Sequence, residues 1–218
     1  MLPIEEARHA IRTLRSRVGE EAYLTNGLGL LARGQFVEIK GERVVVEIVE
    51  VWEKPGEPPA PIALVVAILK APDRMAWLVE KAVELGATHI FFVPFARSFP
   101  RRPSESRLRR VALAALKQNL RSLLPHIQVC QNLHDVPWHA FERRLFGEIG
   151  GSLPLRKALP HAPQSTLWLV GPEGDFTSEE RSTLRGLGLQ GVTLGHLRLR
   201  AETAALLYLS ALKTFWGY

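Results

Sequence analysis

The sequence predicts a small β-rich region followed by an α/β domain with a mostly parallel sheet and helices on both faces. Three observations lead there. Stretches rich in Val and Ile fill much of the first fifty residues, and "EKPGEPPAP" (residues 53–61) then interrupts both helix and strand. After it, short apolar runs alternate with amphipathic stretches. The predicted domains are residues 1–56 and 62–218.

Composition favours an ordinary globular protein in the cytoplasm. Of the 218 residues, 46% are hydrophobic and 23% are charged. The longest apolar run, residues 60–69, is half as long as the roughly 20 residues of a membrane helix, so no membrane association is expected. The N-terminus lacks the order of a signal peptide, and the single cysteine, Cys130, allows no intrachain disulfide.

Each predicted element follows from its local pattern. "QFVEIK" (35–40) and "RVVVEIVEVWEK" (43–54) are strands of the first domain. In the second, "IALVVAIL" (62–69) is a strand covered on both faces. Residues 71–86 form a helix with Pro72 in its first turn and Gly86 at its end. Further strands are expected at 89–93, 126–130, 144–150 and 166–171, and a further helix at 104–121.

Charge is concentrated in one segment. The net charge is +6, but residues 97–121 hold seven arginines and one lysine against the single acid Glu105. Arg107, Arg110, Lys117 and Arg121 would share one side of a helix. This segment permits a nucleic-acid partner, and a solvated helix face is the alternative.

The first of two glycine turns is "GPEGDF" (171–176), directly after a predicted strand. Thr177 and Glu180 have the spacing of a capping box, so a helix should begin there. In parallel α/β sheets ligands bind beyond the carboxyl ends of strands, where this turn lies. A plain connection between strand and helix is the alternative.

The second turn follows the strand "VTLG" (192–195) and precedes an apolar helix that we expect to be capped by Thr203. Burial inside the domain or a subunit interface would each explain so apolar a helix. Within the turn, Arg198 and Arg200 would lie on one face of an extended segment and suit an anionic or electron-rich substrate. The alternative is a structural arginine–glutamate pair in which Glu202 holds the loop closed.

Taken together, "VGPEGDFTSEE" and "LGHLRLRAETAAL" closely resemble the closing signature of the RsmE-type 16S rRNA (uracil-N3) methyltransferases of the SPOUT class. "LKAPDRMAWLVEKAVELGATHIFFVPFARS" resembles the earlier segment of the same family. The resemblance extends from Ile62 to the C-terminus. The N-terminal region corresponds in position to the family's small PUA-like RNA-binding domain.

The resemblance implies a trefoil knot in which both glycine turns form a pocket for S-adenosylmethionine. It also implies a homodimer joined through the knots and C-terminal helices, with ribosomal RNA or the small ribosomal subunit as substrate. Carried over residue by residue, the cofactor-binding positions are Val170, Gly171, Pro172, Glu173, Gly174, Leu194, Gly195, Leu197, Leu199 and Arg200.

Arg200 and Glu202 are the expected catalytic residues, since the resemblance places them nearest the methyl group. N3 of uridine is a poor nucleophile until its proton leaves. An arginine would stabilise the developing anion, and a carboxylate or water would take the proton. We expect Arg200 to be the stabiliser and Glu202 an orienting partner.

A large RNA substrate would account for the basic segment. Phosphate contacts are expected from Arg12, Arg15, Arg97, Arg101, Arg102, Arg107, Arg110 and Arg121. Three departures from the family pattern stand out. Asp175 replaces a glycine common in the family and could cap the following helix, and "LKQNLRSLLP" lacks the usual small-residue pattern. The N-terminus is short, so the first strand of the RNA-binding domain is expected to be missing or rebuilt.

No metal site is expected, because Cys130, His134 and His139 fit no common zinc spacing and have no evident fourth ligand. Two alternative functions are left open. One is a knotted methyltransferase that modifies another RNA position, and the other is a non-catalytic RNA-binding protein of the same fold. A generic nucleotide-binding protein lacks support, since there is no P-loop or GxGxxG motif.

Overall fold

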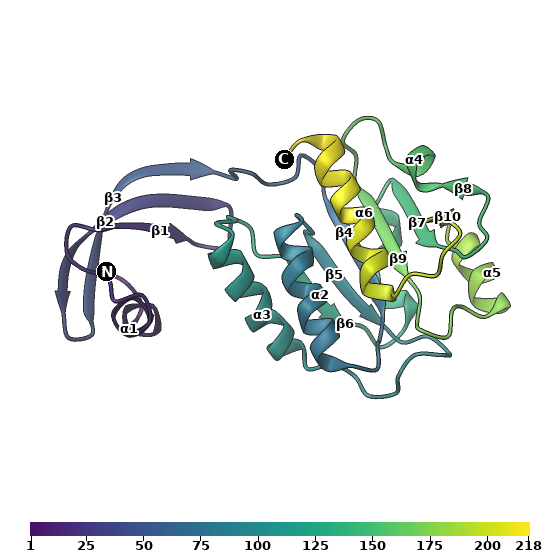
Figure 1. Ribbon diagram of the computed structural model, residues 1–218, viewed down its shortest axis with the longest axis horizontal. Helices are drawn as coiled ribbons and strands as arrows, with labels where there is room; N and C mark the ends of the chain where they lie inside the picture. Colours follow the sequence, from purple (N-terminus) through teal and green to yellow (C-terminus); the bar gives the residue numbers. More distant parts are fainter. The chain divides into compact units, whose positions relative to one another are not determined.

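A computed structural model describes residues 1–218 (Figure 1). The chain divides into two compact units. Unit 1 comprises Met1–Gly56 and Leu116–Leu123, and unit 2 comprises Glu57–Ala115 and Leu124–Tyr218. Unit 1 therefore contains a short segment from the middle of the chain, which the sequence did not lead us to expect.

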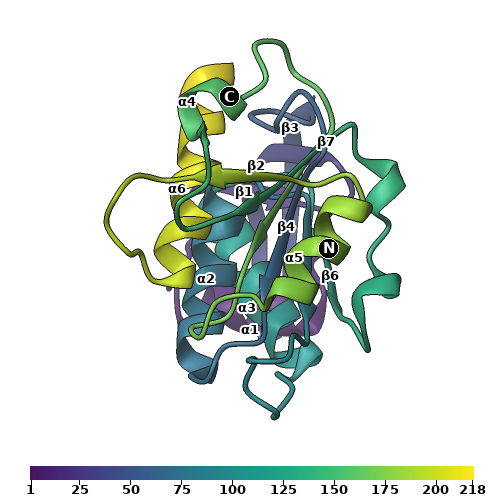
Figure 2. The same cartoon turned by 90° about the vertical axis from the view of Figure 1, so that its right-hand side faces the viewer.

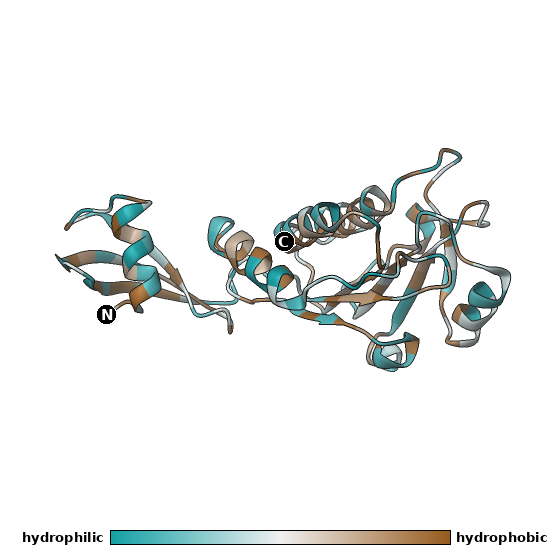
Figure 3. Cartoon of the chain, turned by 90° about the horizontal axis from the view of Figure 1, so that it is seen from below, coloured by the Kyte–Doolittle hydropathy of each residue, from teal (hydrophilic) through white to brown (hydrophobic).

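Unit 1 is an antiparallel sheet of β1 (Glu21–Thr25), β2 (Leu30–Lys40) and β3 (Arg43–Glu53), in that order, with helix α1 (Ile4–Arg12) across one face (Figure 3). Ala7 and Ala10 of α1 pack with Phe36, Val44 and Val46 of the sheet. The sequence indicated mainly strand here, so α1 is an addition.

The segment 116–123 completes unit 1 through backbone contacts. The amide of Gly29 donates to the carbonyl of Ser122 at 2.9 Å, and Leu28 pairs with Leu123 in an isolated antiparallel bridge. The ammonium group of Lys117 also pairs with Glu6 of α1. The loop between β1 and β2 is thus held by residues that follow it by almost one hundred positions.

Unit 2 is built on a seven-stranded sheet in which every pairing is parallel, in the order β6-β5-β4-β9-β7-β10-β8. The strands are β4 (Ile62–Ala67), β5 (His89–Val93), β6 (His126–Val129), β7 (Arg143–Gly147), β8 (Leu153–Pro154), β9 (Thr166–Val170) and β10 (Gln190–Thr193). The prediction of a mostly parallel sheet is confirmed, and β4 and β9 at its centre are fully buried.

Helices cover both faces of this sheet (Figure 2). One side carries α2 (Pro72–Glu84), α3 (Glu105–Gln118) and α6 (Ala201–Trp216). The other carries α5 (Ser178–Gly186) and the short 3-10 helices η1 (Leu133–Asp135) and η2 (Trp138–Ala140), while α4 (Leu155–Ala158) follows β8. The alternation of side chains along β9 supplies both layers, since Leu167 and Leu169 pack toward α5 while Trp168 stacks on Tyr208 of α6.

Two helix boundaries differ from the sequence prediction. Helix α6 begins at Ala201 with Arg200 as its N-cap, so Thr203 lies inside the first turn and is not the cap. Helix α3 ends at Gln118, because Leu120 adopts φ +58°. Arg121 therefore leaves the predicted basic helix face and is only 6% exposed. No helix has the length and apolar composition needed to cross a membrane.

Candidate active site

A cavity of about 680 Å³ lies at the carboxyl ends of β7, β9 and β10 in unit 2. Most of its lining comes from two chain segments, Val170–Asp175 and Val192–Ala201 apart from His196. Gly147–Ile149, Arg74, Arg97 and Ala204 complete it. All ten residues that the family resemblance assigned to the cofactor line this cavity, which places them together in space as expected for a pocket beyond strand ends.

The first wall, Gly171–Phe176, is a tight turn over a buried aromatic ring. The amide of Asp175 donates to the carbonyl of Pro172 at 2.9 Å. Beneath the turn, Phe176 is 1% exposed and packs edge-to-face on Phe95 and Phe146. A Cβ added to Gly171 would stand 2.9 Å from this ring, so only glycine fits here.

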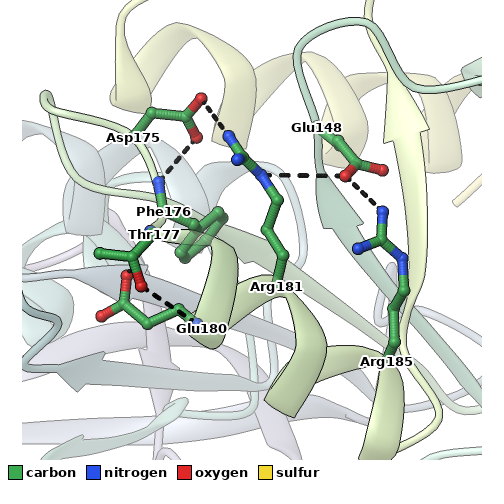
Figure 4. Close-up of polar contacts among 7 residues, drawn as sticks. All are labelled: Glu148, Asp175, Phe176, Thr177, Glu180, Arg181 and Arg185. Carbon is green, nitrogen blue, oxygen red and sulfur yellow. Dashed lines mark hydrogen bonds and ion pairs between the residues drawn. The ribbon is translucent and has the colours of Figure 1, made fainter.

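The end of the first wall joins helix α5 (Figure 4). Thr177 and Glu180 form the predicted capping box, with the Thr177 hydroxyl accepting from the Glu180 amide at 3.1 Å and Glu180 accepting from the Thr177 amide at 2.8 Å. Asp175, for which we expected a capping role, does something else. Its carboxylate accepts from the amide of Phe176 at 2.8 Å and from the guanidinium of Arg181 at 2.7 Å.

The second wall, Leu194–Arg200, is far more open. Gly195 has φ +118°, and a Cβ added there would have no heavy atom within 4 Å. The Gly195 amide donates to the Thr193 hydroxyl at 3.3 Å. Leu197 is 84% exposed. Arg198 and Arg200 are both exposed and line the cavity.

Glu202 is buried and does not line the cavity. It receives a bidentate contact from Arg74 of α2, with Nε to Oε1 at 2.8 Å and Nη2 to Oε2 at 2.5 Å. The third nitrogen of Arg74 donates to Glu173 of the first wall at 3.1 Å. The glutamate therefore does pair with an arginine, as one alternative held, but the partner is Arg74 on another helix and the residues are 128 positions apart.

This arrangement keeps Glu202 ionised. Burial by itself raises the pKa of the Glu202 carboxyl, but the hydrogen bonds from Arg74 and from the backbone outweigh it and leave the pKa below its ordinary value of 4.5. The hydrogen bond with Glu202 correspondingly raises the pKa of Arg74, against the opposing effect of burial. A carboxylate with a lowered pKa is a weak proton acceptor at neutral pH.

The arginines expected to contact RNA have different surroundings. Arg97 donates to the carbonyl of Gly174 at 2.7 Å and so supports the first wall. Arg102 donates to Gln131 at 2.7 Å, and Arg107 pairs with Asp73 at 2.7 Å. Arg101, Arg110, Arg12 and Arg15 are exposed, whereas Arg121 is buried.

Three residues of the site escaped the sequence reasoning: Arg74, Glu148 and Arg181. Arg74 stands in the quoted "DRM" helix start, so a signal existed, but its partners could not be read from the spacing. Glu148 and Arg181 carry no motif. As for metals, no group of three or more His, Cys, Asp or Glu side chains could hold an ion. Burial also raises the pKa of the Cys130 thiol to about 12, with Asp135 and Glu105 adding to the shift.

Comparison with known proteins agrees with this architecture. Residues 56–213 match the model of the RNA methyltransferase domain family. The chain is 32% identical over 173 residues to the ribosomal RNA small subunit methyltransferase E of Mesomycoplasma hyopneumoniae (strain 232), a match that covers 75% of this chain and 74% of that protein.

Two solved structures have the same fold along nearly the whole chain. A probable rRNA methyltransferase from Porphyromonas gingivalis matches with a TM-score of 0.85 and 31% identity, covering 99% of this chain and 93% of that one. The ribosomal RNA small subunit methyltransferase E of Neisseria gonorrhoeae, whose crystal structure is bound to S-adenosyl methionine, matches with a TM-score of 0.84 and 29% identity, covering 99% and 91%.

Proposed function

Because this chain belongs to the RNA methyltransferase family that includes ribosomal RNA small subunit methyltransferase E, we propose that it methylates N3 of a uridine in 16S ribosomal RNA. It is an S-adenosylmethionine-dependent RNA methyltransferase in which a PUA-like N-terminal domain precedes a SPOUT-class catalytic domain in the sequence. The observation that carries the proposal is the cavity between two glycine turns, with exposed arginines at its rim.

The residues present fit S-adenosylmethionine. Gly171, Gly174 and Gly195 contribute backbone without side chains to the lining of the cavity, and Gly195 at φ +118° has a conformation that other residues rarely adopt. Val170, Leu199 and Ala204 add apolar surface. A volume of about 680 Å³ is in the range of small-molecule sites. When bound, the cofactor would supply a sulfonium methyl group, whose bond to sulfur would break as the bond to N3 forms, with the thioether as the leaving group.

Arg200 is the residue that we assign to charge stabilisation. It lies directly before α6, is exposed, and lines the cavity. As the N3 proton leaves, negative charge develops on the uracil, and a guanidinium group beside the ring lowers the energy of that anion. This role requires a fixed charge near the base and no proton transfer by the arginine itself.

Glu202 is better suited to positioning than to proton removal. Its carboxylate is engaged by two nitrogens of Arg74, its pKa is lowered, and it does not line the cavity. We therefore propose that water takes the N3 proton. Glu202 and Arg74 together hold the start of α6, and so Arg200, against the first wall through Glu173.

We propose that exposed arginines of the basic segment bind rRNA phosphates, with Arg101 and Arg110 the best available because they are exposed on or near α3. Arg12 and Arg15, exposed in unit 1, would add to this. Arg97, Arg102 and Arg107 have protein partners that RNA would share or displace. Phosphate contacts would make binding strongly dependent on salt.

A homodimer joined through the C-terminal helices also belongs to the proposal. Leu207 is 40% exposed and Phe215 is 51% exposed on α6, an apolar surface that a second copy would cover. With a ribosomal substrate and a single cysteine, we place the protein in the cytoplasm.

The test is incubation of the purified protein with S-adenosylmethionine and either free 16S rRNA or small ribosomal subunits, followed by mass spectrometry of the nucleosides. We expect one 3-methyluridine per RNA from wild type, and at least about a hundredfold slower methylation by Arg200→Ala. Arg156→Met, at an exposed position on α4, is the matched control and should act like wild type. A methyl group on another atom or base would leave the enzyme class standing and overturn the target. Absence of any methylation, with cofactor bound, would favour an RNA-binding role.

A further inference from the structure

We infer that Asp175, Arg181, Glu148 and Arg185 form an ionic latch that fixes the first wall of the cavity against Gly147–Ile149 and thereby sets the affinity for the cofactor. This inference rests on the proposed function. The four side chains alternate in sign and lie in a row between the end of the first wall and strand β7 (Figure 4).

The latch begins with an unusual backbone conformation. Asp175 has φ +61°, in the left-handed region that favours glycine and that Asp tolerates better than most residues. One carboxylate oxygen accepts from the amide of Phe176 at 2.8 Å, and the other accepts from Arg181 Nη2 at 2.7 Å. The two contacts hold the turn in this conformation, so Asp175 adds a charge that glycine could not supply.

Arg181 links the turn to the opposite side of the cavity. Besides its hydrogen bond to Asp175, its Nε lies 3.8 Å from Glu148 Oε1. Arg185, one helical turn further along α5, pairs with the same oxygen at 2.5 Å. Its guanidinium carbon also lies 5.7 Å from the centre of the Phe146 ring. A single helix therefore presents two cations to one carboxylate.

Glu148 is held where the latch needs it. Its side chain is 13% exposed, and its amide donates to the carbonyl of Val192 at 2.9 Å. A Cβ added to Gly191 of β10 would stand 1.9 Å from Glu148 Oε2, so the absence of a side chain at Gly191 leaves room for this carboxylate.

Both acidic residues of the latch line the cavity. Asp175 and Glu148 are lining residues, whereas Arg181 and Arg185 stand behind them on α5 and are not. The latch is not needed to stabilise the N-terminus of α5, because the Thr177–Glu180 capping box already caps that end of the helix. The contacts are partly shielded, with side-chain exposures of 31% for Asp175 and 27% for Arg181. They should therefore exceed a fully exposed pair in strength.

The experiment is calorimetric titration of the full chain with S-adenosylmethionine. Wild type, Arg181→Met, Asp175→Gly, the double variant and Arg156→Met would be compared at low and high salt. We expect Arg181→Met to raise Kd by roughly threefold to tenfold, and Asp175→Gly to do the same although glycine suits φ +61°. The double variant should be no worse than either single variant, since both break one interaction.

Steady-state kinetics distinguish a role of the latch in positioning the first wall from a general loss of protein stability. In Arg181→Met the KM for cofactor should rise while kcat at saturating cofactor stays at the wild-type value, and Arg181→Lys should recover part of the affinity. High salt should weaken wild-type binding and narrow its difference from Arg181→Met. Wild-type Kd in both single variants, or additive losses in the double variant, would overturn the latch. Failure of wild type itself to bind cofactor would instead overturn the proposed function.

Discussion

The two walls of the cavity are built in different ways although each follows a strand and precedes a helix. The first, Gly171–Phe176, rests on a buried phenylalanine and is tied by hydrogen bonds to Arg97 and Arg181. The second, Leu194–Arg200, has an 84% exposed leucine, two exposed arginines and only short-range contacts around Thr193.

The difference indicates that the two walls have different roles in binding. A wall that is already held in place by other residues loses little conformational entropy when a ligand binds, and this favours affinity for a cofactor. A wall with exposed apolar and cationic groups can adapt to cofactor, RNA or a second copy of the chain. Arg74 joins the two, since it binds Glu173 of the first wall and Glu202 behind the second.

The largest expected effect comes from the second wall. Arg200→Ala should lower kcat by about 10²–10³-fold, because it removes the group that stabilises the uracil anion. Calorimetry should show nearly unchanged cofactor binding, since the first wall is intact. Arg198→Ala is the matched comparison in the same loop and should lower kcat less. Wild-type turnover by Arg200→Ala would contradict the catalytic role that we assign to the second wall.

Breaking the link between the walls should cost stability. Arg74→Met leaves the buried Glu202 carboxylate without its bidentate partner, and we expect about 2 kcal/mol of destabilisation. For a chain of this size that lowers Tm by roughly 4–8 °C in a thermal scan. Glu173→Gln, at the more exposed end of the link, should shift Tm by much less. Equal shifts in the two variants would contradict the central place given to Glu202.

Matched glycine substitutions test how firmly each wall is built. Gly171→Ala places a methyl group against the Phe176 ring, which cannot move away from Phe95 and Phe146, and should cost about 1–3 kcal/mol. Gly195→Ala meets no neighbouring atom, so only backbone strain of about 1 kcal/mol opposes it. Urea unfolding of both variants measures the contrast. A larger loss of unfolding free energy in Gly195→Ala than in Gly171→Ala would contradict the inference that the first wall is the more tightly packed.

The pairing of Glu202 also predicts an acid-side effect. Its pKa is lowered in the folded chain, so its contribution to stability is complete above the ordinary value of 4.5 and is lost as pH falls through the lower, folded value. Glu202→Gln should be less stable than wild type near neutral pH, but its Tm should fall less steeply with acidification in that window. Parallel Tm curves for the two proteins would show that Glu202 does not titrate as we propose.

The smallest effect concerns the approach of RNA to the open wall. Removing two phosphate-binding charges in Arg101→Gln/Arg102→Gln should reduce the slope of log K against log salt by about 1.4, if each contact contributes roughly 0.7 as in single strands. Filter binding at several salt concentrations measures this. Arg156→Met/Lys157→Met removes two exposed charges from α4 and should leave the slope unchanged. An unchanged slope in the first variant would identify the basic segment as a solvated face.

Local pattern was enough to predict much of the fold. Apolar runs located the strands at β4, β5 and β9, and the Thr177–Glu180 spacing located the start of α5. It failed where a distant contact decides the outcome. Helix α1 owes its place to packing on Phe36 and Val44. The early start of α6 has a local cause instead, because Arg200, in an extended conformation, accepts the first helical hydrogen bond from Ala204.

The same limit applies to the site. Both glycine turns could be recognised because their residues are adjacent in sequence, but the partner of Glu202 lies 128 positions away on α2. The sequence could suggest an arginine partner for Glu202 within its own loop, but not Arg74 on another helix. Asp175 could be noted as a departure from the family, while its contact with Arg181 depends on how α5 leaves the turn.

The inclusion of Leu116–Leu123 in unit 1 has a consequence for synthesis of the protein. Residues up to Gly56 emerge first from the ribosome, but the carbonyl of Ser122 that receives the Gly29 amide does not yet exist. At about 5–20 residues per second, the missing piece follows several seconds later. The loop between β1 and β2 therefore lacks these partners while much of the next domain is translated, and a fragment ending at Gly56 would lack them permanently.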